Sequence, residues 1–386
     1  MEQKNEVKIA DREIKIDEII GEIVKGGAPV GRVRKKKEKH SEEKFMEILK
    51  KTSFGTKLRE AAEKIAQGKN GALIVLAEPW QIRKLMLGGF KIDCKFTSER
   101  LVELAKLDGA LVIDPQLKKI HHANVLLIPN PDISSKETGT RHQAAERTSK
   151  QTGKLVVAVS EKTGLITLYS GNIKYPLKSA GMLITRLQSV LDSLEEQKRI
   201  FNSLVNYLNI LEFTNLVTAL NLVSTIQKAE LITRGSRIAR RYLTELGAES
   251  LLLELRLKEI LKNLEEGYVN LIKDYRGKKS FITIRKELSK MSQDSLLEFE
   301  NILKIFDLRS LDEPLQAKGY RILSKISTLN QKETSSIVKE HGMLKNFLDA
   351  NTEDLVKIKG INEKKALEVK KELIKLRDSA MLSQTI

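Results

Sequence analysis

The stretch Asp108-Gly109-Ala110-Leu111-Val112-Ile113 joins a carboxylate on a glycine turn to an apolar run typical of a buried strand. Other apolar runs and helical patterns surround it in alternation. Strands are predicted over 71–77, 109–113, 123–129, 154–160 and 165–170, and helices over 55–67, 97–107 and near 140–151. This mixture predicts an α/β domain with a mixed sheet over residues 46–180.

A second string, Thr138-Gly139-Thr140-Arg141-His142, is typical of a turn that opens a helix. Gly139 permits a close backbone approach, Thr140 is expected to cap the helix, and Arg141 can fork onto phosphate oxygens. Alone, the string fits a capped surface helix equally well, and Asp108 fits an ordinary turn. Together they predict a nucleotide site in which Asp108 binds Mg²⁺ or Mn²⁺ or polarises a sugar hydroxyl.

Bulk composition limits the class of protein. A chain of 386 residues predicts two or three domains, and 41% hydrophobic with only 5% aromatic residues predicts aliphatic cores. The net charge of +17 favours a polyanionic partner, either nucleic acid or an anionic membrane surface. A single cysteine, Cys94, excludes an intrachain disulfide framework, and no apolar run has membrane-spanning length. We expect an intracellular, soluble protein.

The remaining segments predict three further regions. Residues 181–315 carry apolar side chains at steps of three and four, which predicts a helical spine with a bundle core. Residues 316–386 end in two short helices around Gly360, a helix-hairpin-helix pattern that would hold DNA phosphates. Residues 1–45 are polar, and the run from Arg32 to His40 fits a flexible extension or a nucleic-acid-binding arm. The predicted spine stripe comprises Leu183, Leu187, Val190, Leu194, Phe201, Leu204, Leu208 and Leu211.

Over about residues 50–386 the chain resembles the diadenylate cyclase family, in its branch of DNA integrity scanning proteins. The resemblance rests on short motifs in the expected order. These are Gly71-Ala72-Leu73-Ile74, Gly88-Gly89-Phe90, Asp108-Gly109-Ala110, Glu137-Thr138-Gly139-Thr140-Arg141-His142, Ala145-Glu146-Arg147, Lys150-Gln151-Thr152-Gly153-Lys154 and Gly319-Tyr320-Arg321.

The resemblance implies an activity and an assembly. Such proteins condense two ATP into cyclic di-AMP and two pyrophosphates between facing subunits of an octamer, and branched DNA suppresses the synthesis. It implies a cytoplasmic, nucleoid-associated protein with branched or damaged DNA as partner. The implied catalytic residues are Asp108, Arg141 and His142. The implied nucleotide pocket also contains Gly109, Ala110, Leu127, Thr140, Gln143, Ala144 and Ser160. The implied DNA-contact residues are Lys357, Lys359, Gly360, Asn362, Lys364 and Lys365.

Three departures from the family pattern matter. Gln143 and Ala144 stand where an arginine and a threonine are usual, so we expect weaker triphosphate binding or slower turnover. The loop after Ser160 resembles that of the membrane-bound cyclases, which makes Glu161 a second metal-ligand candidate. Asn362 replaces the hairpin's second glycine and is expected to tolerate a left-handed backbone.

Two alternatives remain open at this point. The cyclase domain could be weakened or inactive through Gln143, leaving an oligomeric DNA-binding scaffold. A basic helical DNA-binding protein with an unrelated nucleotide-sensing α/β domain would also fit the charge and the element pattern.

Overall fold

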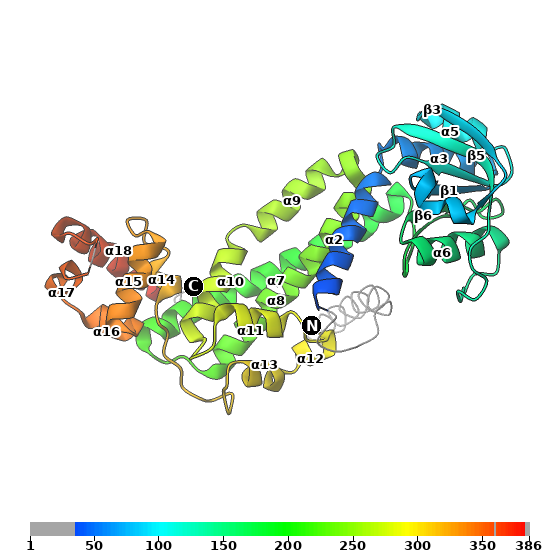
Figure 1. Ribbon diagram of the computed structural model, residues 1–386. Coiled ribbons are helices and arrows are strands. Elements are labelled where there is room, and N and C mark those ends of the chain that lie inside the picture. Colours follow the sequence, from blue (N-terminus) through cyan, green and yellow to red (C-terminus); the bar gives the residue numbers. More distant parts are fainter. Residues whose placement is uncertain (1–34, 359, 383–386) are drawn as a thin grey trace, which may run out of the picture. The chain divides into compact units, whose positions relative to one another are not determined.

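The computed structural model describes residues 35–358 and 360–382, with side chains described from Glu42 onward (Figure 1). The chain forms two compact units. One unit contains the chain up to Gln188 together with Arg240–Leu253, and the other contains Ser189–Ala239 and Glu254 onward. Helix α2 (Lys35–Lys51) shows that the last part of the predicted flexible extension is helical; residues 1–34, including the start of the basic arm, lie outside the described residues.

The first unit is built on an eight-stranded mixed sheet, which confirms the predicted α/β domain. The strand order is β2-β5-β4-β1-β6-β7-β8, and β3 also pairs with β5. Only β1 and β4 run parallel; the other pairs are antiparallel. The strands are β1 (Ala72–Leu76), β2 (Met86–Leu87), β3 (Phe90–Lys95), β4 (Ala110–Ile113), β5 (Lys119–Leu127), β6 (Leu155–Val159), β7 (Ile166–Ser170) and β8 (Ile173–Pro176).

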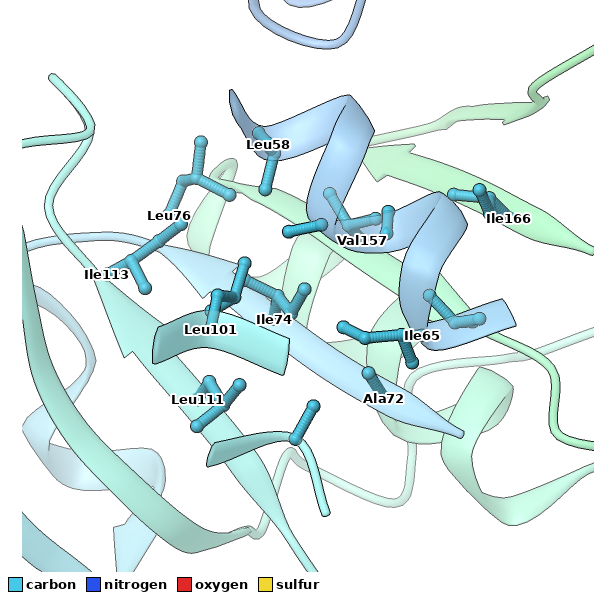
Figure 2. Packing of buried hydrophobic residues seen from close by; sticks show 14 of the residues in the cluster. Leu58, Ile65, Ala72, Ile74, Leu76, Leu101, Leu111, Ile113, Val157 and Ile166 are labelled. Atoms are coloured by element: carbon cyan, nitrogen blue, oxygen red, sulfur yellow. The ribbon is translucent and has the colours of Figure 1, made fainter. Parts of the chain in front are cut away.

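Helices cover both faces of this sheet. Helices α3 (Lys57–Gln67) and α5 (Ser98–Leu104) pack on one face, where Leu58, Leu101 and Ile74 share an aliphatic core (Figure 2). Helix α6 (Thr140–Thr152) packs on the other face through Ala145. The short helices α4 (Pro79–Ile82) and η1 (Arg83–Leu85) lie between β1 and β2. The sheet is therefore fixed by apolar packing, while its strand ends stay available for chemistry.

Helices account for nearly all other regular structure. The stripe on α7 is buried at Leu183, Leu187, Leu194, Phe201 and Leu208, which confirms the prediction of a bundle core. No described helix, from α2 to α18, is long and apolar enough to cross a membrane. These helices are α7 (Ala180–Thr214), α8 (Ala219–Leu246), η2 (Gly247–Ser250), α9 (Leu251–Leu261), α10 (Leu264–Tyr275), α11 (Phe281–Leu288), α12 (Gln293–Leu297), α13 (Phe299–Ile305), α14 (Tyr320–Leu323), α15 (Gln331–His341), α16 (Leu344–Asp349), α17 (Thr352–Val356) and α18 (Glu363–Leu382).

A buried ionic cluster joins three helices of the second unit. Arg321 on α14 pairs with Glu212 on α7 at 2.6 Å between Nη2 and Oε2. The Asp274 carboxylate on α10 accepts hydrogen bonds from the backbone N–H groups of Tyr320 (2.6 Å) and Arg321 (3.1 Å). Burial and the neighbouring Glu212 raise the pKa of Asp274 to about 7. This joint was not predicted from the sequence.

Candidate functional site

The strand register brings the predicted site residues to one edge of the sheet. Strands β1 and β4 are parallel with Leu73 opposite Ala110, so Gly71 and Asp108 precede neighbouring strands at the same edge. A parallel pair of strands begins at one edge because its residues advance together. The edge therefore carries the carboxylate of Asp108 beside the first turn of β1.

Two antiparallel strands end at this same edge. Val159 of β6 lies opposite Ala72, so Ser160 and Glu161 follow at the edge. Val125 of β5 lies opposite Ala110, so the buried Leu127 lies near the turn that carries Asp108. The predicted pocket residues are thus gathered from strands far apart in the sequence.

The turn before β4 can accommodate only glycine. Gly109 has φ +87°, and a Cβ there would lie 2.9 Å from both the Asn124 carbonyl carbon and the Val125 carbonyl oxygen. The obstacle is backbone, so it cannot swing away as a side chain could. Ala110 is fully buried, so it packs beneath the turn and presents no exposed atom to a ligand. The turn thereby fixes Asp108 in an exposed position, where no residue of the described chain bonds its carboxylate.

Arg141 reaches this edge from the start of α6. Gly139, not Thr140 as predicted, is the N-cap residue, and its carbonyl accepts the first helical hydrogen bond from the Gln143 N–H. Because glycine has no side chain, the N-cap residue makes no side-chain cap. The Arg141 guanidinium lies directly over Gly71, where any Cβ would collide with it. Its Nη1 is 3.8 Å from Glu161 Oε2. A half-exposed guanidinium placed between two strand ends can neutralise phosphate charge there.

His142 is held by a residue that sequence reasoning missed. Its Nδ1 lies 3.0 Å from the hydroxyl of Tyr169, which is buried on β7. Burial lowers the pKa of His142, which favours the neutral ring. Burial, followed by the nearby Glu137 carboxylate, raises the pKa of Tyr169, so the phenol keeps its proton. Nothing in the strand pattern distinguished Tyr169 from an ordinary core residue.

The Gln143 side chain is bonded to the preceding loop, although a role in the nucleotide pocket was expected for it. Its Nε2 donates to the backbone carbonyl of Glu137 at 2.8 Å, which ties the preceding loop to α6. Glu137 in turn pairs with Lys174 on β8 at 2.5 Å. Ala144 packs against the apolar cluster under α6. Gln143 and Ala144 are both neutral, so these two positions add no positive charge to the sheet edge.

Four further α6 side chains hold the loop before the helix. Together with Gln143 they explain why the motifs Ala145-Glu146-Arg147 and Lys150-Gln151 follow the Arg-His pair so closely. The start of α6 is therefore positioned by hydrogen bonds from its own loop. The bonds run from Ser135 Oγ to Glu146 (2.6 Å), Arg147 Nε to the Ile133 carbonyl (2.9 Å), Lys150 Nζ to the Ser134 carbonyl (2.7 Å) and the Asn130 N–H to Gln151 (3.0 Å).

The residues present fit a metal that is shared with a nucleotide. The parts of the chain that the structure describes contain no group of three His, Cys, Asp or Glu side chains able to hold an ion. Mg²⁺ is commonly held by one or two carboxylates together with substrate phosphates, and the exposed Asp108 suits that arrangement. Glu161 is already close to Arg141, so its metal role stays a prediction.

The predicted DNA-contact residues lie around the turn between α17 and α18. Gly360 has φ +96°, and Lys359 lies outside the described residues. Asn362 does not adopt the expected left-handed backbone; instead its Oδ1 accepts the Lys365 N–H at 2.9 Å and caps α18.

The lysines of this turn differ in their pairing. Lys357 pairs with Asp354 at 2.8 Å, and the half-buried Lys365 pairs with Glu333 at 2.7 Å. Lys364 is exposed, and no carboxylate of residues 35–358 or 360–382 pairs with it. Two of the three described lysines of the turn are therefore already paired with carboxylates.

Comparison with known proteins agrees with this geometry. Residues 59–173 match the family described as DisA bacterial checkpoint controller nucleotide-binding, and residues 177–313 match the DisA bacterial checkpoint controller linker region. The mixed sheet thus belongs to a nucleotide-binding domain of the diadenylate cyclase class, and the linker region of that class follows it.

Curated relatives name the family more closely. Proteins called DNA integrity scanning protein DisA are 37% identical in Clostridium botulinum strain Loch Maree, 36% in Clostridium acetobutylicum and 36% in Clostridium perfringens strain SM101. Each match covers 89% of this chain and 97–99% of the relative. The chain belongs to the DisA family of diadenylate cyclases. A solved structure of DacA from Staphylococcus aureus is 26% identical and covers 38% of this chain and 95% of its own, with a TM-score of 0.27.

Proposed function

We propose that this protein condenses two ATP molecules into cyclic di-AMP and two pyrophosphates. The observation that carries the proposal is the sheet edge at which the unpaired Asp108, the Gly109 turn and the Arg141 guanidinium meet. Phosphoryl transfer needs positioning and charge neutralisation more than covalent chemistry from the protein. This edge supplies one carboxylate for the attacking group and one cation for the phosphates.

Each step balances without an outside reactant. The 3′-hydroxyl oxygen of one ATP forms a bond to the α-phosphorus of the other, the bond to pyrophosphate breaks, and the hydroxyl proton is released. Asp108 polarises the attacking hydroxyl, and Arg141 binds the phosphate oxygens. The Tyr169 hydroxyl lies 3.0 Å from Nδ1 of His142, and this contact orients the neutral ring so that Nε2 is left for the nucleotide. Mg²⁺ or Mn²⁺ bound with Asp108 would supply further positive charge at the phosphates.

The reaction requires two copies of the site that face each other. An exposed apolar patch on the same domain supports such self-association: Leu87 lies directly opposite Leu126, and both are more than half exposed. Phe90 and Ile128 beside them are also more than half exposed. Contiguous apolar surface of this kind is typical of protein interfaces. We propose a homo-oligomer, an octamer as in the family.

DNA is the second partner in this proposal. The turn with Gly360 can bring backbone N–H groups close to a phosphate, and the exposed Lys364 lies in the first turn of α18. Such contacts hold the DNA backbone without reading sequence, which suits branched or damaged DNA. A cytoplasmic, nucleoid-associated protein follows from this partner.

One observation favours the alternative of a weakened cyclase that acts as a DNA-binding scaffold. Gln143 offers a neutral amide that is already bonded to the Glu137 carbonyl, where an arginine would add a positive charge. A charged hydrogen bond contributes about 1.5–3 kcal/mol. The loss would slow the enzyme without removing Asp108 or Arg141.

The test is the stoichiometry of the reaction and its dependence on partner subunits. Purified protein is incubated with ATP and Mg²⁺ or Mn²⁺, and pyrophosphate and cyclic di-AMP are quantified. We expect two pyrophosphates for each cyclic di-AMP. When wild-type subunits are exchanged with Asp108→Asn subunits, the activity of each wild-type subunit should fall in proportion to the wild-type fraction. Constant activity for each wild-type subunit would contradict a shared site.

A further inference from the structure

Four cations gather where α10 ends and α14 begins. We call Lys273, Arg276, Lys278 and Lys318 the α10–α14 corner. The Lys318 amine donates to the carbonyl of Gly277 at 3.4 Å, and Lys273 Nζ lies 5.6 Å from the centre of the Tyr320 ring. These contacts bring residues more than forty positions apart in sequence into one surface.

Little counter-charge surrounds the corner among the described residues, and the buried Asp274 attracts Lys318 only at longer range. Across residues 42–358 and 360–382, no carboxylate forms an ion pair with any of its four cations, whereas the adjacent Lys279 pairs with Asp307. The nearest acid, Asp274, is buried, and its two oxygens already accept the N–H groups of Tyr320 and Arg321. Arg276 Nε is buried and has no hydrogen-bond partner among the described residues. The corner therefore carries positive charge that no ion pair within the described chain balances.

Like charges held this close repel each other. Burial, followed by the neighbouring Arg276, lowers the pKa of Lys318. An anion that binds at the corner attracts each of these cations and offsets their mutual repulsion. The lysines of the α17–α18 turn contrast with this, because Lys357 and Lys365 have carboxylate partners.

We propose that the α10–α14 corner binds the phosphate backbone of duplex DNA as a second contact surface beside the α17–α18 turn. The inference rests on the DNA-binding part of the proposed function. Duplex DNA fits better than a single free phosphate, because four cations spread over a turn and two helix ends match a row of charges. The contact carries no base-reading group and is therefore sequence-independent.

The test measures how full-length protein binds a fluorescent duplex as salt rises from about 50 to about 200 mM. In the double variant Lys273→Gln with Lys318→Gln, the slope of log K against log salt should shrink by about 1.8, because each phosphate contact contributes about 0.9. Affinity at the low-salt end should fall roughly tenfold. The single variant Lys278→Gln, at an exposed position that cannot disturb packing, should shrink the slope by about 0.9.

A matched control makes the same change of charge elsewhere. Lys290→Gln with Lys304→Gln alters two exposed lysines of the same unit that form no ion pair within the described chain, and it should leave the slope unchanged. Equal losses in the control and corner variants would overturn the inference, because general electrostatics would explain both. An unchanged slope in both corner variants, while Lys364→Gln weakens binding, would overturn the inference and leave the α17–α18 turn as the DNA site. Wild-type protein that binds no DNA would overturn both proposals.

Discussion

The sheet-edge site and the α17–α18 turn both use a glycine at positive φ beside basic side chains, but they are built differently. Gly109 lies against the backbone of β5, and Arg141 is stacked over Gly71. Gly360 has room around it, and the nearest atom to a Cβ there would be Glu333 Oε1 at 3.5 Å. Chemistry on a phosphorus atom needs fixed geometry, whereas holding a DNA backbone needs only charge and accessible N–H groups.

The same contrast extends to what stabilises each unit. The sheet domain rests on aliphatic cores on both faces, while α7, α10 and α14 meet through the buried Arg321 cluster. Arg321→Met should therefore destabilise the second unit by about 3–5 kcal/mol, because Glu212 would be left buried without its cation. Chemical denaturation of the full chain should show an early transition for this unit while the sheet domain unfolds as before. A single unchanged transition would contradict the distinction.

The change in stability that this cluster causes as pH varies should be somewhat smaller than the loss caused by Arg321→Met. The pKa of Asp274 is raised to about 7 by burial and Glu212, so the folded state holds a proton that the unfolded state has lost. Stability of the second unit should then fall as pH rises from about 4 to about 7. Asp274→Asn removes the titrating group, so the denaturation midpoint of this variant should no longer fall as pH rises. A wild-type slope that persists in Asp274→Asn would assign the effect to other groups.

A pair of glycine substitutions separates close packing from backbone conformation. Both Gly109→Ala and Gly360→Ala place a side chain at positive φ, which costs about 1–2 kcal/mol. Only Gly109→Ala also meets backbone atoms at 2.9 Å, so turnover should fall by about 100-fold or more. Gly360→Ala should weaken DNA binding by only a few fold. Small and equal effects of both substitutions would contradict our view that the sheet edge is more rigid than the α17–α18 turn.

Gln143→Arg sharpens the comparison within the sheet-edge site. The added guanidinium can still donate to the Glu137 carbonyl and also bring charge toward the phosphates, so activity should rise by about ten- to 100-fold. Gln143→Ala serves as the control for loss of the tie to the loop. Steady-state kinetics with ATP measure both variants. No gain in Gln143→Arg, from a folded protein that makes little product, would favour the scaffold alternative.

The smallest effects on DNA binding are expected at the α17–α18 turn, where substitution of Lys364 should matter more than substitution of the paired Lys357. Lys364 is exposed and unpaired within the described chain, whereas Lys357 is bound to Asp354. Lys364→Gln should weaken DNA binding by about threefold and reduce the salt slope by about 0.9. Lys357→Gln should change both quantities less. The reverse order would show that the Lys357 pair opens when DNA binds.

Much of the sheet could be predicted from sequence, and the exceptions have physical causes. Continuous apolar runs marked β1, β4 and β6, because strands buried on both faces need apolar residues throughout. Strands β3 and β8 alternate between half-buried and exposed residues, and β2 has only two residues, so their patterns were too weak. Residues that touch across distant segments, such as Tyr169 with His142, leave no local signal.

The candidate site shows the same limit. Asp108 and Arg141 were found from short motifs, but the position of Arg141 over Gly71 depends on the pairing of β1 with α6 across the fold. The cap of α6 was predicted at Thr140 and lies at Gly139, and the capping role of Asn362 was not predicted, because backbone conformation, not residue preference alone, decides a cap.

The most direct measurement identifies the product. Wild-type protein and Asp108→Asn are each incubated with ATP and Mg²⁺ or Mn²⁺, and the nucleotides are analysed by mass spectrometry. Thermal unfolding of both proteins verifies the fold, which should be unchanged because the Asp108 side chain is exposed and makes no described contact. We expect cyclic di-AMP from the wild type and none from Asp108→Asn. Equal amounts of cyclic di-AMP from both proteins would contradict the assignment of the sheet edge as the active site.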